Sequence, residues 1–170
     1  LPISARCKLM ATWHGRIVMA RSADEPQNWH MSAVSEPYNW DISPAVLTST
    51  IACSGNSTLA GLCPDIINAL IPYNDDLLIV GCDHSIWRLT GDPMRGGQWD
   101  QVSDVTGIAF GRAWAKDESG VIYFFGSRGG VWRMAPGGFP EPMTRMSIEG
   151  RLKDVNLRTT RVELKWNSED

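Results

Sequence analysis

The sequence lacks long apolar runs and any excess of positive charge. No stretch of its 170 residues approaches the roughly 18 apolar residues of a membrane helix, and no signal-peptide pattern opens it. The 16 Lys and Arg residues are outnumbered by 19 Asp and Glu, which gives a formal net charge of −3. A nucleic-acid groove usually needs a clustered basic face. We therefore expect no membrane segment and no direct contact with nucleic acid.

Cysteine and histidine are few and scattered. The cysteines are Cys7, Cys53, Cys63 and Cys82, and the histidines are His14, His30 and His84. No C-x-x-C pair occurs, and the histidine spacings match no zinc motif. Because two of the cysteines lie beside or inside apolar runs, we expect reduced thiols in preference to disulfides, with zinc less favoured than either. The sequence predicts no metal and no cofactor.

Helical periodicity is also scarce, whereas the alternation of apolar and polar residues that is typical of strands recurs along the chain. A short motif occurs three times: Trp, a basic or polar residue, Leu or Met, and a small residue. Its copies begin at Trp29, Trp87 and Trp132, each after a turn and a short apolar run. The step from the second copy to the third is close to the roughly 40–50 residues of a propeller blade. The repetition predicts an all-β, β-propeller-like fold.

We expect one all-β domain over residues 1–170, or a segment of a larger propeller, with about three four-stranded antiparallel blades. The predicted repeat units are residues 7–40, 66–103 and 111–146, an irregular connection is predicted at 41–65, and one strand of a further blade is predicted at 161–166. Eight tryptophans provide large anchors for such sheets, and we expect the three motif tryptophans to occupy equivalent packed positions.

Three blades do not close a ring, because closed propellers generally have about four to eight. Their two end sheets would keep unpaired faces. The chain also begins at Leu1 without a methionine. We therefore expect that it is a piece of a longer protein, or that another copy or a partner completes the ring.

Three acidic motifs could carry chemistry, and each has a simpler interpretation as a turn. Asp117-x-x-Gly120 resembles a calcium-binding turn but lacks the longer series of oxygen ligands of an EF-hand loop. Asp75-Asp76 could be paired carboxylates of a glycosidase, yet adjacent strand residues point to opposite faces. Asp83-His84-Ser85 has the residue types of a catalytic triad, but neighbours in sequence rarely converge as nucleophile, base and orienter. We predict no catalytic residue.

Two loops are candidates for contacts with other proteins. The Gly-rich sequences Arg95-Gly96-Gly97 and Arg128-Gly129-Gly130 lack the phosphate-loop pattern and predict tight turns. Residues 91–97 and 136–142 would be equivalent loops on one face, while two tryptophans lie outside the threefold motif and are candidates for exposed contact. The predicted interaction residues are Trp40, Trp99, Arg95 and Phe139.

The order of several phrases resembles the β-propeller virion proteins of tailed bacteriophages, of the kind found in tail nozzles, hubs and stabilisation proteins. The phrases lie at residues 15–20, 28–32, 36–41, 70–81, 91–93 and 120–124, within a resemblance that spans roughly residues 15–150. The resemblance implies a structural protein located in the virion, acting in the tail as a rigid ring for assembly. It also implies other virion proteins and copies of the chain itself as partners, and it carries over no catalytic residue.

Two other functions remain open. A carbohydrate- or receptor-binding propeller could use Trp40 or Trp99 as a stacking platform for a sugar ring. A glycoside hydrolase fragment would need two acidic side chains that converge on one sugar, and the sequence shows no such pair. We therefore expect that the protein is not an enzyme.

Overall fold

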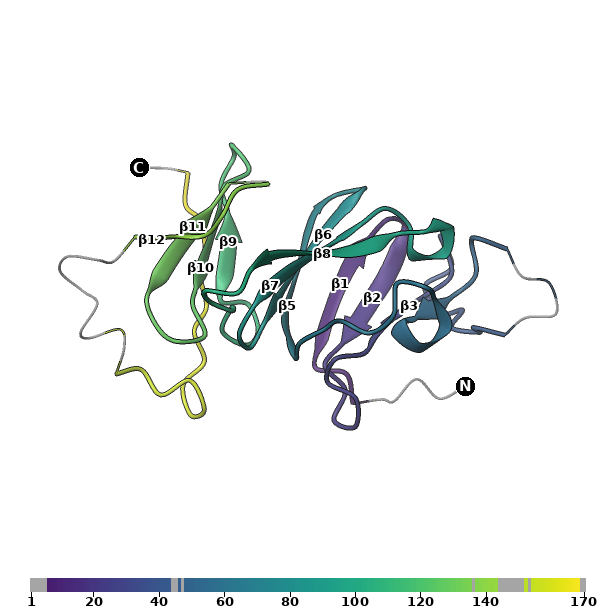
Figure 1. The fold of residues 1–170 in the computed structure, drawn as a ribbon, viewed down its shortest axis with the longest axis horizontal. Coiled ribbons are helices and arrows are strands. Elements are labelled where there is room, and N and C mark those ends of the chain that lie inside the picture. The colour runs from purple at the N-terminus through teal and green to yellow at the C-terminus, as the bar shows by residue number, and fades with distance from the viewer. Residues whose placement is uncertain are drawn as a thin grey trace.

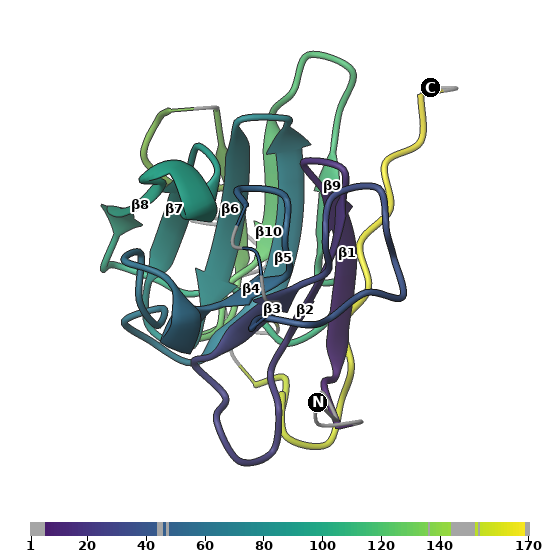
Figure 2. The same cartoon turned by 90° about the vertical axis from the view of Figure 1, so that its right-hand side faces the viewer.

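The computed structural model describes residues 6–43, 46, 48–135, 137–143, 152 and 154–168. Three four-stranded antiparallel sheets stack along the long axis, with the N-terminus at one end and the C-terminus at the other (Figure 1). Each sheet is a meander, and the first strands of the three sheets lie on the same side of the stack (Figure 2). The predicted all-β, propeller-like fold of three blades is confirmed.

The fourth strand of blade 1 comes from a part of the chain where the sequence predicts no strand. Its strands are β1 (Leu9–Trp13), β2 (Arg16–Ala20), β3 (Trp29–Met31) and β4 (Cys53–Ser54), and the 3-10 turn η1 (Gly55–Ser57) follows. β4 pairs with β3 and lies inside the predicted connection 41–65. The predicted unit 7–40 is therefore too short, because its outer strand returns only after a long excursion.

Blades 2 and 3 follow the predicted repeat closely. Blade 2 contains β5 (Ile67–Asn74), β6 (Leu77–Cys82), β7 (Ile86–Thr90), the 3-10 turn η2 (Pro93–Arg95) and β8 (Gln98–Ser103). Blade 3 contains β9 (Trp114–Lys116), β10 (Ile122–Phe125), β11 (Val131–Met134) and β12 (Glu141–Pro142). The last residues of the predicted unit 111–146, residues 144–146, lie outside the described residues.

Blades 1 and 2 pack through an apolar cluster that includes the buried Trp29, with Trp99 packed against it. Val18 and Met31 of blade 1 meet Leu78, Val80 and Leu89 of blade 2 in this cluster. The ring of Trp29 contacts that of Trp99 edge-on, with 6.4 Å between centroids. Both indole N–H groups donate to the carbonyl of Gly61, at 3.0 and 3.4 Å. The tryptophans thus bury apolar area and also fasten the connection after β4 to the blade interface.

Blades 2 and 3 approach more closely, through aliphatic residues and one phenylalanine. Ile79 of β6 packs with Ile122 and Phe124 of β10. A Cβ atom at Gly81 would lie 2.5 Å from the side chain of Ile108. Glycine is required there because any side chain would push the segment before β9 away from the sheet.

The three motif tryptophans do not all occupy the same position. Trp87 lies opposite Val80, and Trp132 lies opposite Phe124, so both face the preceding blade. Trp29 lies opposite Ala20, one residue out of step, and it faces the following blade. Our expectation of threefold equivalence is therefore right for two tryptophans and wrong for Trp29, since successive strand residues point to opposite faces of a sheet.

The predicted fourth-unit strand at 161–166 is not a strand. Instead, this segment lies in an extended form against blade 3, where Leu164 N–H donates to the carbonyl of Arg112 at 3.1 Å. Val162 and Leu164 pack on the cluster that contains Phe125. Trp166 stacks on Tyr123 with 5.3 Å between ring centroids and 14° between planes. The C-terminal segment, residues 154–166 together with Leu152, therefore covers the outer face of blade 3.

The helical content of the described chain is confined to short turns. None of its helices has the length and apolar character needed to cross a lipid bilayer. The connection after β4 is held to blade 1 by Trp29, whose indole N–H donates to the carbonyl of Gly61.

Candidate interaction surface

At the opposite end of the stack, the described part of the chain leaves one sheet face partly open. Alternate residues of β1, β2 and β3 pack toward blade 2, so the residues between them point away from it. We call this set the outer face of blade 1; it comprises Met10, Thr12, Ile17, Met19 and His30. Met10 is 70% exposed, and Ile17, Met19 and His30 are half-buried.

The strand registers show what this face corresponds to elsewhere. Met19 lies between Met10 and His30 in blade 1. The same position is held by Val80, between Leu70 and Trp87, in blade 2. It is held by Phe124, between Trp114 and Trp132, in blade 3. In blades 2 and 3 these residues pack against the preceding blade. The outer face of blade 1 therefore has the position and apolar character of a surface that receives another blade.

A buried arginine holds the open blade in shape. Arg16 of β2 is 2% exposed, and its Nη1 donates to the carbonyls of Ser32 and Ile51 at 2.9 and 2.6 Å. Its Nη2 donates to the carbonyl of Ser49 at 2.8 Å and lies 3.6 Å from Asp92 of blade 2. One side chain thus joins β2 to both ends of the excursion and to the next blade, which keeps the outer face of blade 1 rigid.

The single titratable group on this face is the imidazole of His30. Partial burial lowers its pKa from the ordinary 6.5, and the negative charge of Glu25 opposes part of that shift. Across the sheet the ring has Met19 on one side and Ser54 on the other. The face is therefore largely apolar, and its imidazole is neutral at neutral pH, which suits contact with another protein surface.

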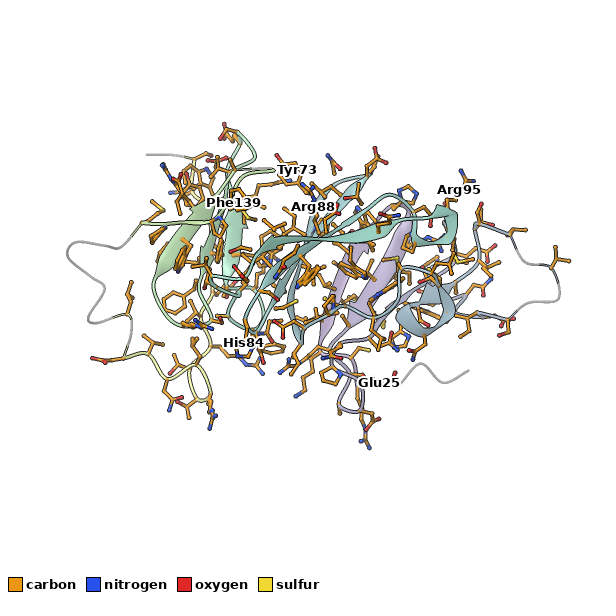
Figure 3. The ribbon with its side chains drawn as sticks, in the orientation of Figure 1. Glu25, Tyr73, His84, Arg88, Arg95 and Phe139 are labelled. Carbon is orange, nitrogen blue, oxygen red and sulfur yellow. The ribbon has the colours of Figure 1, made fainter. Side chains whose placement is uncertain are left out.

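The structure separates the four interaction residues that the sequence predicts. Trp99 is half-buried in the interface of blades 1 and 2, so it offers no open ring face. Trp40 is half-buried as well, whereas Phe139 is 79% exposed. Arg95 is exposed and donates to Ser49 Oγ at 2.9 Å. Figure 3 shows Arg95 near the blade 1 end and Phe139 over blade 3, so the two loops do not form one site.

Sequence reasoning missed Met10, Met19 and His30. A signal was present in β2, where Arg16 to Ala20 carries apolar residues on both faces. A strand with two apolar faces is typical of a sheet covered on both sides. The pattern could have indicated a receiving face on blade 1, although not what covers it.

The acidic motifs are turns, as expected. Asp117 Oδ1 accepts hydrogen bonds from Ser119 Oγ at 2.7 Å and Val121 N–H at 2.8 Å. The first of these bonds is the main reason that the Asp117 pKa is lowered. Asp75 and Asp76 lie exposed between β5 and β6. In the described part of the chain, no group of three His, Cys, Asp or Glu side chains is placed to hold a metal ion.

Asp83-His84-Ser85 also forms a turn. The hydroxyl of Ser85 donates to Asp65 Oδ2 at 2.8 Å, and no bond joins it to His84. The four cysteines are free thiols, and the sulfur atoms of Cys63 and Cys82 lie 3.6 Å apart in the interface of blades 1 and 2. This neighbouring thiol and burial raise the pKa of Cys82, so the Cys82 thiol stays protonated.

Comparison with known proteins adds no family assignment. The chain matches no protein-family model and no curated protein. Function is therefore inferred from the fold and from the surfaces that it exposes.

Proposed function

We propose that the protein is a structural component of a tailed-bacteriophage particle, in its tail, where it acts as a rigid assembly module. The resemblance over residues 15–150 supports the phage context. A stack of three sheets, each packed on the next, supports a mechanical role because the whole unit resists bending. Its partners are copies of itself and other virion proteins.

The outer face of blade 1 is the observation that carries this proposal. The equivalent residues of blades 2 and 3 are packed under a neighbouring blade, whereas Met10 is 70% exposed. Met10 lies beside the half-buried Ile17 and Met19, and apolar side chains gathered on one accessible sheet face are typical of a protein–protein contact. The face is the binding surface of the module.

The occupant of this face is a second copy of the chain. The far end of the stack is covered by the chain's own C-terminal segment, so the outer face of blade 1 is the end that needs a partner. Two copies that meet through this face bury both open ends in one symmetric contact, the commonest form of homo-oligomer. Methionine side chains adapt their shape, which makes such a self-complementary contact easier to pack.

The test is the mass of the protein in solution, measured by light scattering at micromolar concentration. We expect a dimer or larger symmetric oligomer for the natural chain and a monomer for Met19→Arg, because the guanidinium would be buried unpaired in the contact. Met143→Arg is the matched control, since Met143 is 52% exposed and lies on blade 3 beyond β12. A monomeric natural chain, or an oligomer that persists in Met19→Arg, would contradict the proposal.

The carbohydrate- or receptor-binding propeller is the second candidate function. The half-buried position of Trp99 argues against the predicted stacking on that ring. A pocket on another part of the surface, lined by Arg21, Arg128 and Arg158, favours this candidate instead. The glycosidase alternative gains no support, because Asp75 and Asp76 belong to an exposed turn.

A further inference from the structure

A pocket of about 510 Å³ lies where corresponding turns of the three blades meet. Arg21 follows β2, His84 lies in the turn after β6, and Arg128 lies in the turn after β10. Figure 3 places His84 at the lower edge of the stack, away from Arg95 and Phe139 at its upper side. The pocket is thus formed by the repeat itself and is separate from the outer face of blade 1.

Positive charge dominates this pocket. Three arginines line it, Arg21, Arg128 and Arg158, and a single carboxylate, Asp83, accompanies them. Arg21 is held in place, because its guanidinium lies 5.8 Å from the ring centre of Phe110. Among the residues that the structure describes, the guanidinium groups of Arg128 and Arg158 form no hydrogen bond or ion pair. Two exposed cations are therefore available to an anionic ligand.

The carboxylate is fixed by a buried amide. Asn68, only 4% exposed, uses its Nδ2 to donate to Asp83 Oδ1 and, at 3.2 Å, to the carbonyl of Ile108. With both hydrogens of its amide engaged, Asn68 orients Asp83 and leaves the second carboxylate oxygen as an acceptor for a ligand. The Oδ1 atom of Asn68 is buried and has no partner among the described residues. Burying an amide oxygen without a hydrogen-bond partner costs free energy, and such a group is unusual unless the amide positions a neighbouring side chain.

The remaining wall is apolar, with one hydroxyl. Phe110, Ala109 and Leu157 line the pocket together with Ser127. The Oγ atom of Ser127 accepts from Gly107 N–H at 3.2 Å, so its own hydrogen is free to donate. Guanidinium groups bind carboxylates, an aspartate accepts from hydroxyls, and apolar side chains cover the C–H face of a sugar ring. The volume falls within the roughly 300–1,000 Å³ of small-molecule sites.

We propose that this pocket binds a sugar unit that carries a carboxylate, of the hexuronic-acid class. The carboxylate pairs with Arg128 and Arg158, ring hydroxyls donate to Asp83, and the apolar face of the ring lies against Phe110. A neutral sugar leaves the two cations unpaired, and inorganic phosphate makes no use of Asp83 or the apolar wall. This site does not depend on the assembly role, since it lies at a different surface.

The experiment is a titration of the full chain with glucuronic acid, with glucose as the neutral match and inorganic phosphate as the simple anion, followed by calorimetry or by amide chemical shifts. We expect saturable binding of glucuronic acid and none of glucose at the same concentrations. Arg128→Gln should weaken the binding about ten-fold, the loss of one charge-assisted hydrogen bond. Arg133→Gln is the matched control, because Arg133 lies on the same strand pair and is joined to Glu141 at 2.9 Å outside the pocket.

Three results would overturn the proposal. They are the absence of saturable binding of glucuronic acid, equal affinity in Arg128→Gln and the natural chain, and binding of glucose or phosphate as tight as that of glucuronic acid. The last result would reduce the pocket to a general sugar or anion site. Because Arg128 is exposed, its substitution should leave the circular-dichroism spectrum unchanged, and the same spectrum checks that the variant is folded.

Discussion

The two ends of the stack are finished in different ways. At the blade 3 end, the C-terminal segment covers the sheet with Val162 and Leu164, and Trp166 stacks on Tyr123. At the blade 1 end, no described segment covers Met10 in this way, and Met19 beside it is half-buried. The described chain therefore covers the outer face of blade 3 with its own C-terminal segment and leaves Met10 of blade 1 exposed. Under our proposal, a second copy of the chain supplies the missing cover.

The sharpest test of this comparison uses one position in two surroundings. Phe124 and Met19 are equivalent in register, but Phe124 is 0% exposed under blade 2 whereas Met19 is half-buried at the open end. We expect Phe124→Ala to lower the free energy of unfolding by about 3–5 kcal/mol, because it leaves a cavity between two sheets. Denaturant titration at a concentration where the chain is monomeric measures the effect.

Met19→Ala is the substitution to compare with Phe124→Ala. In the monomer it should cost well under half as much as Phe124→Ala, since part of its surface is already in water. If the two substitutions cost the same, the outer face of blade 1 would be covered within the chain, and the contrast between the ends would be wrong.

Arg16 provides the next largest effect, at the open end. Arg16→Met keeps most of the apolar stem but removes three hydrogen bonds to the carbonyls of Ser32, Ser49 and Ile51. We expect a loss of about 2–4 kcal/mol, because the buried carbonyl of Ser32 and two partly buried carbonyls are left unpaired. Hydrogen exchange should show the added opening in β3 and β4 and little change in blade 3. Uniform loss of protection across all three blades would mean that blade 1 is not held separately.

Trp166 tests the covered end and should have a smaller effect. Its ring is 48% exposed and stacks on Tyr123. We expect Trp166→Ala to cost about 0.5–1.5 kcal/mol, which is typical of an aromatic pair. Limited proteolysis should then cut residues 154–166 faster, while Trp40→Ala, the control, leaves that rate unchanged. Equal rates in the natural chain and Trp166→Ala would show that the stack does not hold the segment.

The smallest effect concerns acidity at the open end. Because the pKa of His30 is lowered in the folded chain, the unfolded chain binds the proton more readily, and stability falls as the pH drops below the ordinary pKa of 6.5. A second copy on this face would bury the ring further and strengthen the trend. We expect the oligomer to dissociate more readily at about pH 5.5 than at about pH 7.5, and His30→Gln to reduce that difference. A mass that does not change with pH would contradict burial of His30 in the contact.

The sequence predicted blades 2 and 3 well because their strands alternate clearly and are joined by short turns. The predicted unit 66–103 contains β5 to β8, and the predicted unit 111–146 contains β9 to β12. It did not predict β4, because two residues, Cys53–Ser54, carry no periodicity of their own. The error at Trp29 arises because a shift of one residue in register exchanges the two faces of a strand. A sequence motif gives the residue types but not the register of the strand that carries them.

The surfaces were harder to predict than the fold. The outer face of blade 1 depends on which residues of β1, β2 and β3 lie opposite one another, which sequence spacing alone does not give. Arg21, Asp83 and Arg128 are far apart in the chain, and the stacking of three blades brings them to one pocket. Exposed loops such as that of Phe139 were predicted from composition, but exposure alone did not gather them into a site.

The excursion between β3 and β4 has a consequence for how the chain folds. The other neighbouring strands of blades 1 and 2 are joined by connections of two to eight residues, whereas residues 32–52 must be closed before β4 can pair. A connection roughly ten times longer than the turn between β1 and β2 adds about 2 kcal/mol of closure entropy. Although blade 1 precedes blades 2 and 3 in this sequence, we expect it to be completed after them. Until Arg16 binds the carbonyl groups of the excursion, blade 2 would pack on a blade of three strands.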